Sequence, residues 1–123
     1  MIKELISRAK DANNPVIDCI LALYEGRFEP GVCAAMIREY IADDEKAMQS
    51  RGIEPIHCAV ALLPDTSMAR LLVEEAGADI NAWCCDNTPL SLAVLVGKSV
   101  DFVKELLDMG AKRQPEDNVL FYA

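Results

Sequence analysis

The sequence predicts an all-α fold, a solenoid of stacked helix-turn-helix units joined by short loops. Two segments carry the same order of residues, EPIHCAVALL and TPLSLAVLVG. Their prolines, Pro55 and Pro89, are 34 residues apart, and Gly77 and Gly110, which end leucine-rich stretches, are 33 apart. Such a period is typical of repeat proteins, in which a unit cannot bury its apolar face alone and must stack on its neighbours.

The first helix of each unit is predicted to begin at its proline. Proline fixes φ and needs no N–H partner in the first turn of a helix. Glu54 and Thr88 precede the two prolines, so each can lie at the N-cap. Ala59 and Ala93 follow four residues after the prolines. Their small side chains allow this helix to lie close to its neighbours.

The second helix of each unit is predicted from its leucines. They give it an apolar face and are Leu71, Leu72, Leu106 and Leu107. Gly77 and Gly110 follow at the position where a helix commonly ends in a left-handed residue. Each unit is therefore a helical hairpin, followed by a polar stretch that reverses toward the next proline.

These segments resemble the ankyrin-repeat family. Its TPLHxA and GADVNA elements correspond here to PIHCA at 55–59, GADINA at 77–82 and TPLSLA at 88–93. The resemblance implies an ankyrin-repeat solenoid with a short finger loop projecting from each repeat. It also implies a protein-binding module rather than an enzyme.

We expect one ankyrin-repeat domain over residues 1–123. Residues 1–13 are predicted to form an N-terminal capping helix, and residues 14–53 a degenerate repeat with an enlarged loop at 25–31 and a second helix at 32–41. Repeats at 54–87 and 88–117 follow, and residues 118–123 form either a partial repeat or a cap. Whether the natural chain continues past Ala123 stays open.

Composition narrows the classes of partner. With 20 acidic and 12 basic residues the formal charge is −8, which opposes nucleic-acid binding and favours a basic protein partner. The longest apolar runs, 19–24 and 58–63, are far shorter than the roughly 20 residues that cross a bilayer. No export signal is visible, and five cysteines without regular spacing indicate reduced thiols. We expect a cytoplasmic protein, with delivery into a host cell as one version.

The sequence offers little for catalysis or metal binding. The resemblance implies that His57, the single histidine, bonds neighbouring loop backbone, and Cys58 beside it points in a different direction on a helix. Cys84 and Cys85 with His57 and Cys58 are conceivable zinc ligands, but their spacing fits no familiar zinc module. No phosphate-binding loop or catalytic motif is present. We therefore predict no catalytic residue, no cofactor and no metal.

The residues predicted to bind a partner lie on the fingers and the concave helix face. Trp83 begins a finger and is either buried under the next finger or an exposed anchor for a partner. The resemblance places Leu62, Leu95 and Val96 on the concave face, as an apolar groove or as packing against an unusual neighbour. The full predicted set is Ile53, Leu62, Trp83, Asn87, Leu95 and Val96.

The function predicted is non-catalytic binding of one partner protein, by a chain that is favoured to be a monomer. Narrower versions are an adaptor, a bacterial immunity protein and a piece of a bacterial effector. A different class of function is a thiol-dependent enzyme or redox sensor that uses Cys84 or Cys85. A third is the structural N-terminal part of a longer solenoid.

Overall fold

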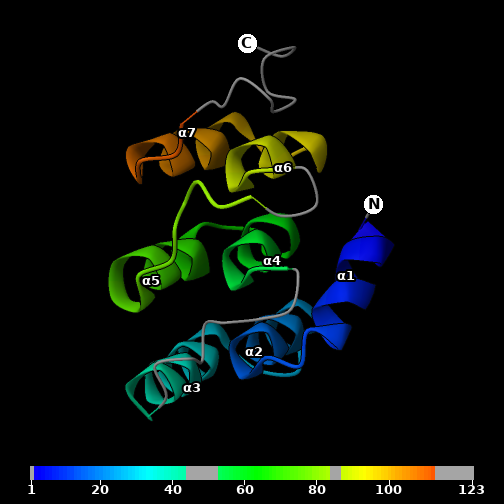
Figure 1. Ribbon diagram of the computed structural model, residues 1–123, viewed down its shortest axis with the longest axis vertical. Coiled ribbons are helices and arrows are strands. Elements are labelled where there is room, and N and C mark those ends of the chain that lie inside the picture. The colour runs from blue at the N-terminus through cyan, green and yellow to red at the C-terminus, as the bar shows by residue number, and fades with distance from the viewer. Residues whose placement is uncertain (1, 44–52, 84–86, 113–123) are drawn as a thin grey trace.

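The computed structural model describes residues 2–43, 53–83 and 87–112, which form seven helices and no strand. Three hairpins, α2–α3, α4–α5 and α6–α7, lie one above another (Figure 1). The predicted all-α repeat fold is therefore confirmed. The helices are α1 (Ile2–Asp11), α2 (Pro15–Tyr24), α3 (Pro30–Asp43), α4 (Pro55–Leu62), α5 (Ser67–Ala76), α6 (Pro89–Leu95) and α7 (Val100–Asp108).

The hairpins form two columns of helices, with α2, α4 and α6 in one and α3, α5 and α7 in the other (Figure 1). The middle helix, α4, contacts α2, α5 and α6, and all of its side chains are buried. Ala59 and Ala93 have exposed fractions of 1% and 0%, as expected of small residues between closely packed helices. One continuous apolar core thus runs through all three hairpins.

The helix starts follow the local chemistry of the sequence. A proline opens α2, α4 and α6. The side chain of Asn14 accepts two backbone N–H bonds of α2, at 2.8 and 3.0 Å. Thr88 and Ser91 form a reciprocal capping box at the start of α6, whereas Glu54 makes no side-chain cap. Of the two residues predicted to act as N-caps, only Thr88 provides a side-chain bond.

The end of α5 shows why a glycine follows it. Gly77 has φ of 72°, a left-handed conformation that costs glycine little, and its N–H bonds the carbonyl of Leu72. The N–H of Ala78 bonds the same carbonyl at 3.0 Å. Both bonds satisfy the free end of the helix and turn the chain into the finger, as predicted from the sequence.

The first hairpin differs from the prediction at its loop. α3 begins at Pro30, two residues earlier than expected, and runs to Asp43. Proline suits the first turn because no N–H bond is needed there. The connection between α2 and α3 is consequently residues 25–29, shorter than the predicted loop.

The N-terminal helix lies alongside the column of α2 and α4 (Figure 1). Leu5, Ala9 and Ala12 are buried. α1 contacts both α2 and α4, so it bridges two successive repeats. Within the described part of the chain, no helix is long and apolar enough to cross a membrane.

Candidate functional site

Trp83 is the aromatic residue among the predicted binding residues, and its side chain is exposed. It lies in the finger after α5, and 46% of its surface is exposed. Of the two alternatives left by the sequence, exposure therefore holds rather than burial under the next finger. A half-exposed tryptophan offers a large apolar surface for a partner.

Three other predicted binding residues are buried. The exposed fractions are 1% for Ile53, 5% for Leu62 and 9% for Asn87. The side-chain oxygen of Asn87 also accepts a hydrogen bond from Ser91 Oγ at 3.1 Å. Burial leaves Ile53 and Asn87 little surface for direct contact with a partner, because both side chains already serve the packing of the fold.

The apolar pairs on α4 and at the end of α6 have different environments. Ala61 and Leu62 are buried, whereas Leu95 and Val96 are partly exposed. α1 contacts α4, and among the described residues it makes no comparable contact with α6. Within those residues α1 is thus a neighbour of α4 and not of α6, and Leu95 and Val96 at the end of α6 stay partly exposed.

His57 has a structural environment. It is 1% exposed, and its Nε2 lies 3.2 Å from the backbone oxygen of Asn87 in the next finger. Nδ1 is buried and makes no hydrogen bond of normal geometry within the described residues. Burial lowers the pKa of His57, and backbone groups of Asn87 and Ala82 offset only part of that effect. The predicted bond from His57 to loop backbone is confirmed.

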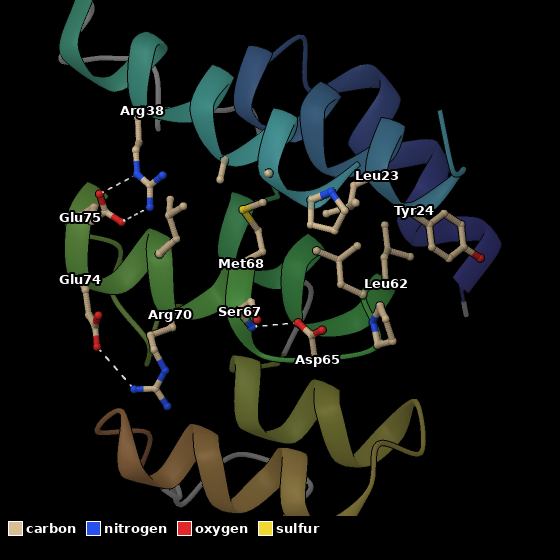
Figure 2. A pocket seen from close by; sticks show the side chains of 16 residues that line it. Leu23, Tyr24, Arg38, Leu62, Asp65, Ser67, Met68, Arg70, Glu74 and Glu75 are labelled. Carbon is tan, nitrogen blue, oxygen red and sulfur yellow. Dashed lines mark hydrogen bonds and ion pairs between the residues drawn. The ribbon is translucent and has the colours of Figure 1, made fainter. Parts of the chain in front are cut away.

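A groove that sequence reasoning missed lies between α3 and α5, on the opposite column from α1. Its volume is about 620 Å³. Figure 2 shows apolar side chains gathered in it from two successive repeats. Its apolar lining includes Leu23, Tyr24, Ala34, Leu62, Met68 and Leu71.

Ion pairs mark one end of this groove. Arg38 of α3 bonds Glu75 of α5 through two atoms, Nε at 2.9 Å and Nη2 at 3.0 Å from its carboxylate oxygens. The hydrogen bond from Arg38 lowers the pKa of Glu75. Arg70 pairs with Glu74 at 3.4 Å (Figure 2). Arg38 and Glu75 are 37 residues apart, so no local sequence pattern indicates their contact.

The next junction between repeats is filled by the chain itself. Lys98, in the connection between α6 and α7, donates from Nζ to the backbone oxygen of Leu63 at 2.7 Å. Its ammonium lies 5.1 Å from the ring centre of the buried Phe102. Thr66 donates a hydrogen bond to Glu105 across the same junction. Polar and aromatic contacts therefore join the second and third repeats.

The buried thiols are poorly suited to thiol chemistry. Cys19, Cys33 and Cys58 are buried thiols that form no disulfide among the described residues. Burial raises the pKa of Cys19 to about 11, and it also raises the pKa of Cys33. A reactive cysteine needs a lowered pKa. Cys84 and Cys85 lie outside the described residues, and within those residues no group of side chains could hold a metal ion.

Comparison with known families agrees with the geometry. The family model for the ankyrin repeat matches residues 51–84 and 85–118, together more than half of the chain. No curated protein matches the chain, and no solved structure does either. The matched stretches contain α4 to α7 and the finger that carries Trp83. The chain therefore belongs to the ankyrin-repeat family.

Proposed function

We propose that this chain is a non-catalytic module that binds a partner protein through the finger at Trp83 and the end of α6. Ankyrin repeats are in general protein-interaction modules. The observation that carries the proposal is the exposure of Trp83, 46% of whose surface is free of the core. Tryptophan is enriched among residues that dominate binding energy because it brings a large apolar area and an N–H donor.

The position of α1 supports this choice of surface. α1 packs on α2 and α4, the first two helices of the column that ends with α6, so part of their surface is already covered by α1. Leu95 and Val96, at the end of the third helix of the column, are partly exposed. We infer that a partner contacts the last repeat, and that Ile53, Leu62 and Asn87 support the binding surface from beneath.

The partner is expected to be basic. The chain has a formal charge of −8, and complementary charge speeds and orients protein association. An adaptor, an immunity protein and a piece of an effector differ in partner and not in this mechanism. Affinity capture with this chain from a lysate of its native cells, followed by mass spectrometry, identifies which applies.

Trp83→Ala tests the binding surface. We expect this substitution to weaken binding of the captured partner by about 2 kcal/mol or more, as for a central aromatic anchor, while the fold persists. Calorimetric titration at low and high ionic strength measures the affinity, which should fall with salt because added ions screen the acidic surface. Since Trp83 is the single tryptophan, the ¹⁹F resonance of incorporated 5-fluorotryptophan reports contact at this side chain directly.

The control is Val100→Ala, which removes an apolar side chain that is 69% exposed on α7. It should bind like the parent chain. Unchanged affinity in folded Trp83→Ala, with an unshifted fluorine resonance, would remove Trp83 from the binding surface. Binding that is insensitive to salt would discard the acidic surface as a source of recognition.

A further inference from the structure

We propose that the groove between α3 and α5 is a second docking surface, which takes a short basic amphipathic segment of a partner protein. The proposal concerns the column of helices opposite to α1 and does not depend on Trp83. It rests on three features of the groove: its apolar lining, the contrast with the neighbouring junction, and the charges around its rim.

The lining is apolar in the middle and open to solvent. Leu62, Met68 and Leu71 form a buried floor, with exposed fractions of 5%, 5% and 8%. Tyr24 lines the groove and keeps 44% of its surface exposed, so it is available to a bound segment. Figure 2 shows Tyr24 and Leu23 at the end away from the Arg38–Glu75 pair. An apolar channel between two helices, with an ion pair at one end, is the kind of groove that an amphipathic segment occupies.

The neighbouring junction shows what fills such a space. The connection between α6 and α7 reads VGKS, and its third residue, Lys98, reaches back to the preceding repeat over Phe102. The connection between α4 and α5 reads LPDT, and its third residue is Asp65. Asp65 is shorter and carries the opposite charge. The groove therefore lacks the long basic side chain that Lys98 provides at the next junction. A lysine or arginine of a partner, with apolar residues beside it, can take that place.

Charges on the rim favour a basic segment. The lining contains three carboxylates and two guanidinium groups, and Arg38 and Arg70 are paired with Glu75 and Glu74. Asp65 is left without a basic side chain among the described residues. One of its oxygens accepts the N–H of Ser67 at 3.0 Å (Figure 2), and the residue is exposed. An incoming ammonium or guanidinium can therefore pair with Asp65 without breaking an existing ion pair.

Gly31 gives a way to close the groove without disturbing the core. It lies in the first turn of α3 and lines the groove, and a Cβ built there meets no atom within 4 Å. Gly31→Trp should therefore place an indole in the groove while the helix is retained. Gly31→Ala is the matched control, because it makes the same backbone change without filling the space.

The probe is a synthetic helical peptide with leucines at every third and fourth position and lysines elsewhere. Titration of the whole chain, followed by ¹H–¹⁵N NMR, should show saturable shifts in α3 and α5. Affinity should fall by about tenfold or more in Gly31→Trp and stay unchanged in Gly31→Ala, as expected when an apolar anchor site is filled. Absence of binding, or equal binding to Gly31→Trp, would overturn the proposal.

Charge is tested separately. A peptide with glutamates in place of the lysines should bind far more weakly, and Asp65→Asn should weaken the lysine peptide while Asp108→Asn does not. Equal binding of both peptides would refute the basic character of the occupant. If an anionic apolar dye binds the groove and the peptide cannot displace it, the groove is a small-molecule site instead, and the proposal fails. Trp83→Ala should bind the peptide normally. The groove and the binding surface at Trp83 are therefore tested independently of each other.

Discussion

His57 illustrates how one side chain joins a helix to a segment of the chain 30 residues away. Its imidazole is enclosed by the core of α4, and it bonds the backbone of the following finger at Asn87. A buried neutral imidazole is stable as long as it is not protonated, since burial disfavours the charged form. The residue therefore links the stability of the finger to pH.

We predict that folded His57 titrates below 6.5, the ordinary value for histidine, because burial lowers its pKa. In the unfolded chain the imidazole binds its proton near the ordinary value, so the unfolded state holds more protons once the pH falls below about 6.5. The free energy of unfolding should therefore decrease as the pH falls from 7 through the folded pKa. NMR of the single imidazole and urea titrations at several pH values measure both effects.

The control is the same NMR titration in concentrated urea, which gives the unfolded pKa. A variant His57→Asn should lose the part of the pH dependence that lies between the two pKa values. A folded pKa at or above 6.5 would contradict the prediction, and it would mean that the bonds to backbone outweigh burial.

At the scale of elements, a few polar contacts cross the junction between the second and third repeats in addition to the shared apolar core. Lys98 satisfies the carbonyl of Leu63 at the end of α4, where the following residue is a proline. Asn81 donates to the carbonyl of Gly110 at 3.2 Å and accepts from the N–H of Lys112 at 2.8 Å. These contacts reach from one repeat into the next and hold α6 and α7 in register with α4 and α5.

We predict that Lys98→Met lowers the free energy of unfolding by about 1 to 2 kcal/mol, because the carbonyl of Leu63 loses its partner. Methionine preserves most of the apolar stem, so the loss comes mainly from the ammonium. Urea unfolding followed by circular dichroism measures it. Lys104→Met, at an exposed position of α7, is the control and should change stability little. Equal stability of the two variants would show that the bond from Lys98 contributes nothing net.

The sequence predicted these elements where the signal is local. Prolines, Thr88 as an N-cap and Gly77 mark helix ends, and each acts within a few residues of itself. The start of α3 at Pro30 was missed because the same proline also fits a loop. The position of α1 on α2 and α4 was not predictable in this detail, since docking depends on the shape of two repeats together.

At the scale of the whole molecule, α1 acts as a brace across two repeats. Leu5 and Ala9 are buried, and the helix contacts α2 and α4. In a solenoid each repeat otherwise contacts only its neighbours through the stacking faces. A helix that touches two repeats adds a second connection between them.

We predict that Leu5→Ala destabilises the chain by about 2 to 3 kcal/mol, within the range of about 2 to 5 kcal/mol that is usual for truncating a buried leucine. Amide exchange should rise in α4 as well as in α2, because both helices lose the packing of α1. Hydrogen exchange followed by NMR gives this distribution. Ser7→Ala, at an exposed position of α1, is the control and should leave exchange unchanged. Faster exchange in α2 alone would contradict a bridging role.

The candidate surfaces were predictable only in part. Trp83 was identified from its place in the finger, but its exposure depends on how the finger lies against the stack. Ile53 and Asn87 belong to the same segments as exposed residues, yet they point into the core. The groove between α3 and α5 could not be predicted from the sequence. It lies at the junction of the first and second repeats, where the short Asp65 occupies the position that Lys98 has at the next junction.

The buried thiols of the described residues can also report how often the helices open. Cys19 and Cys33 lie in the first repeat and Cys58 in the second, whereas residues 88–117 contain no cysteine. The closed helices bury these sulfurs away from an alkylating reagent, and burial also raises the pKa of Cys19 to about 11 and that of Cys33 above its ordinary value. Alkylation at Cys19, Cys33 or Cys58 therefore reports a transient opening of the first or second repeat, whereas opening of residues 88–117 leaves no such mark.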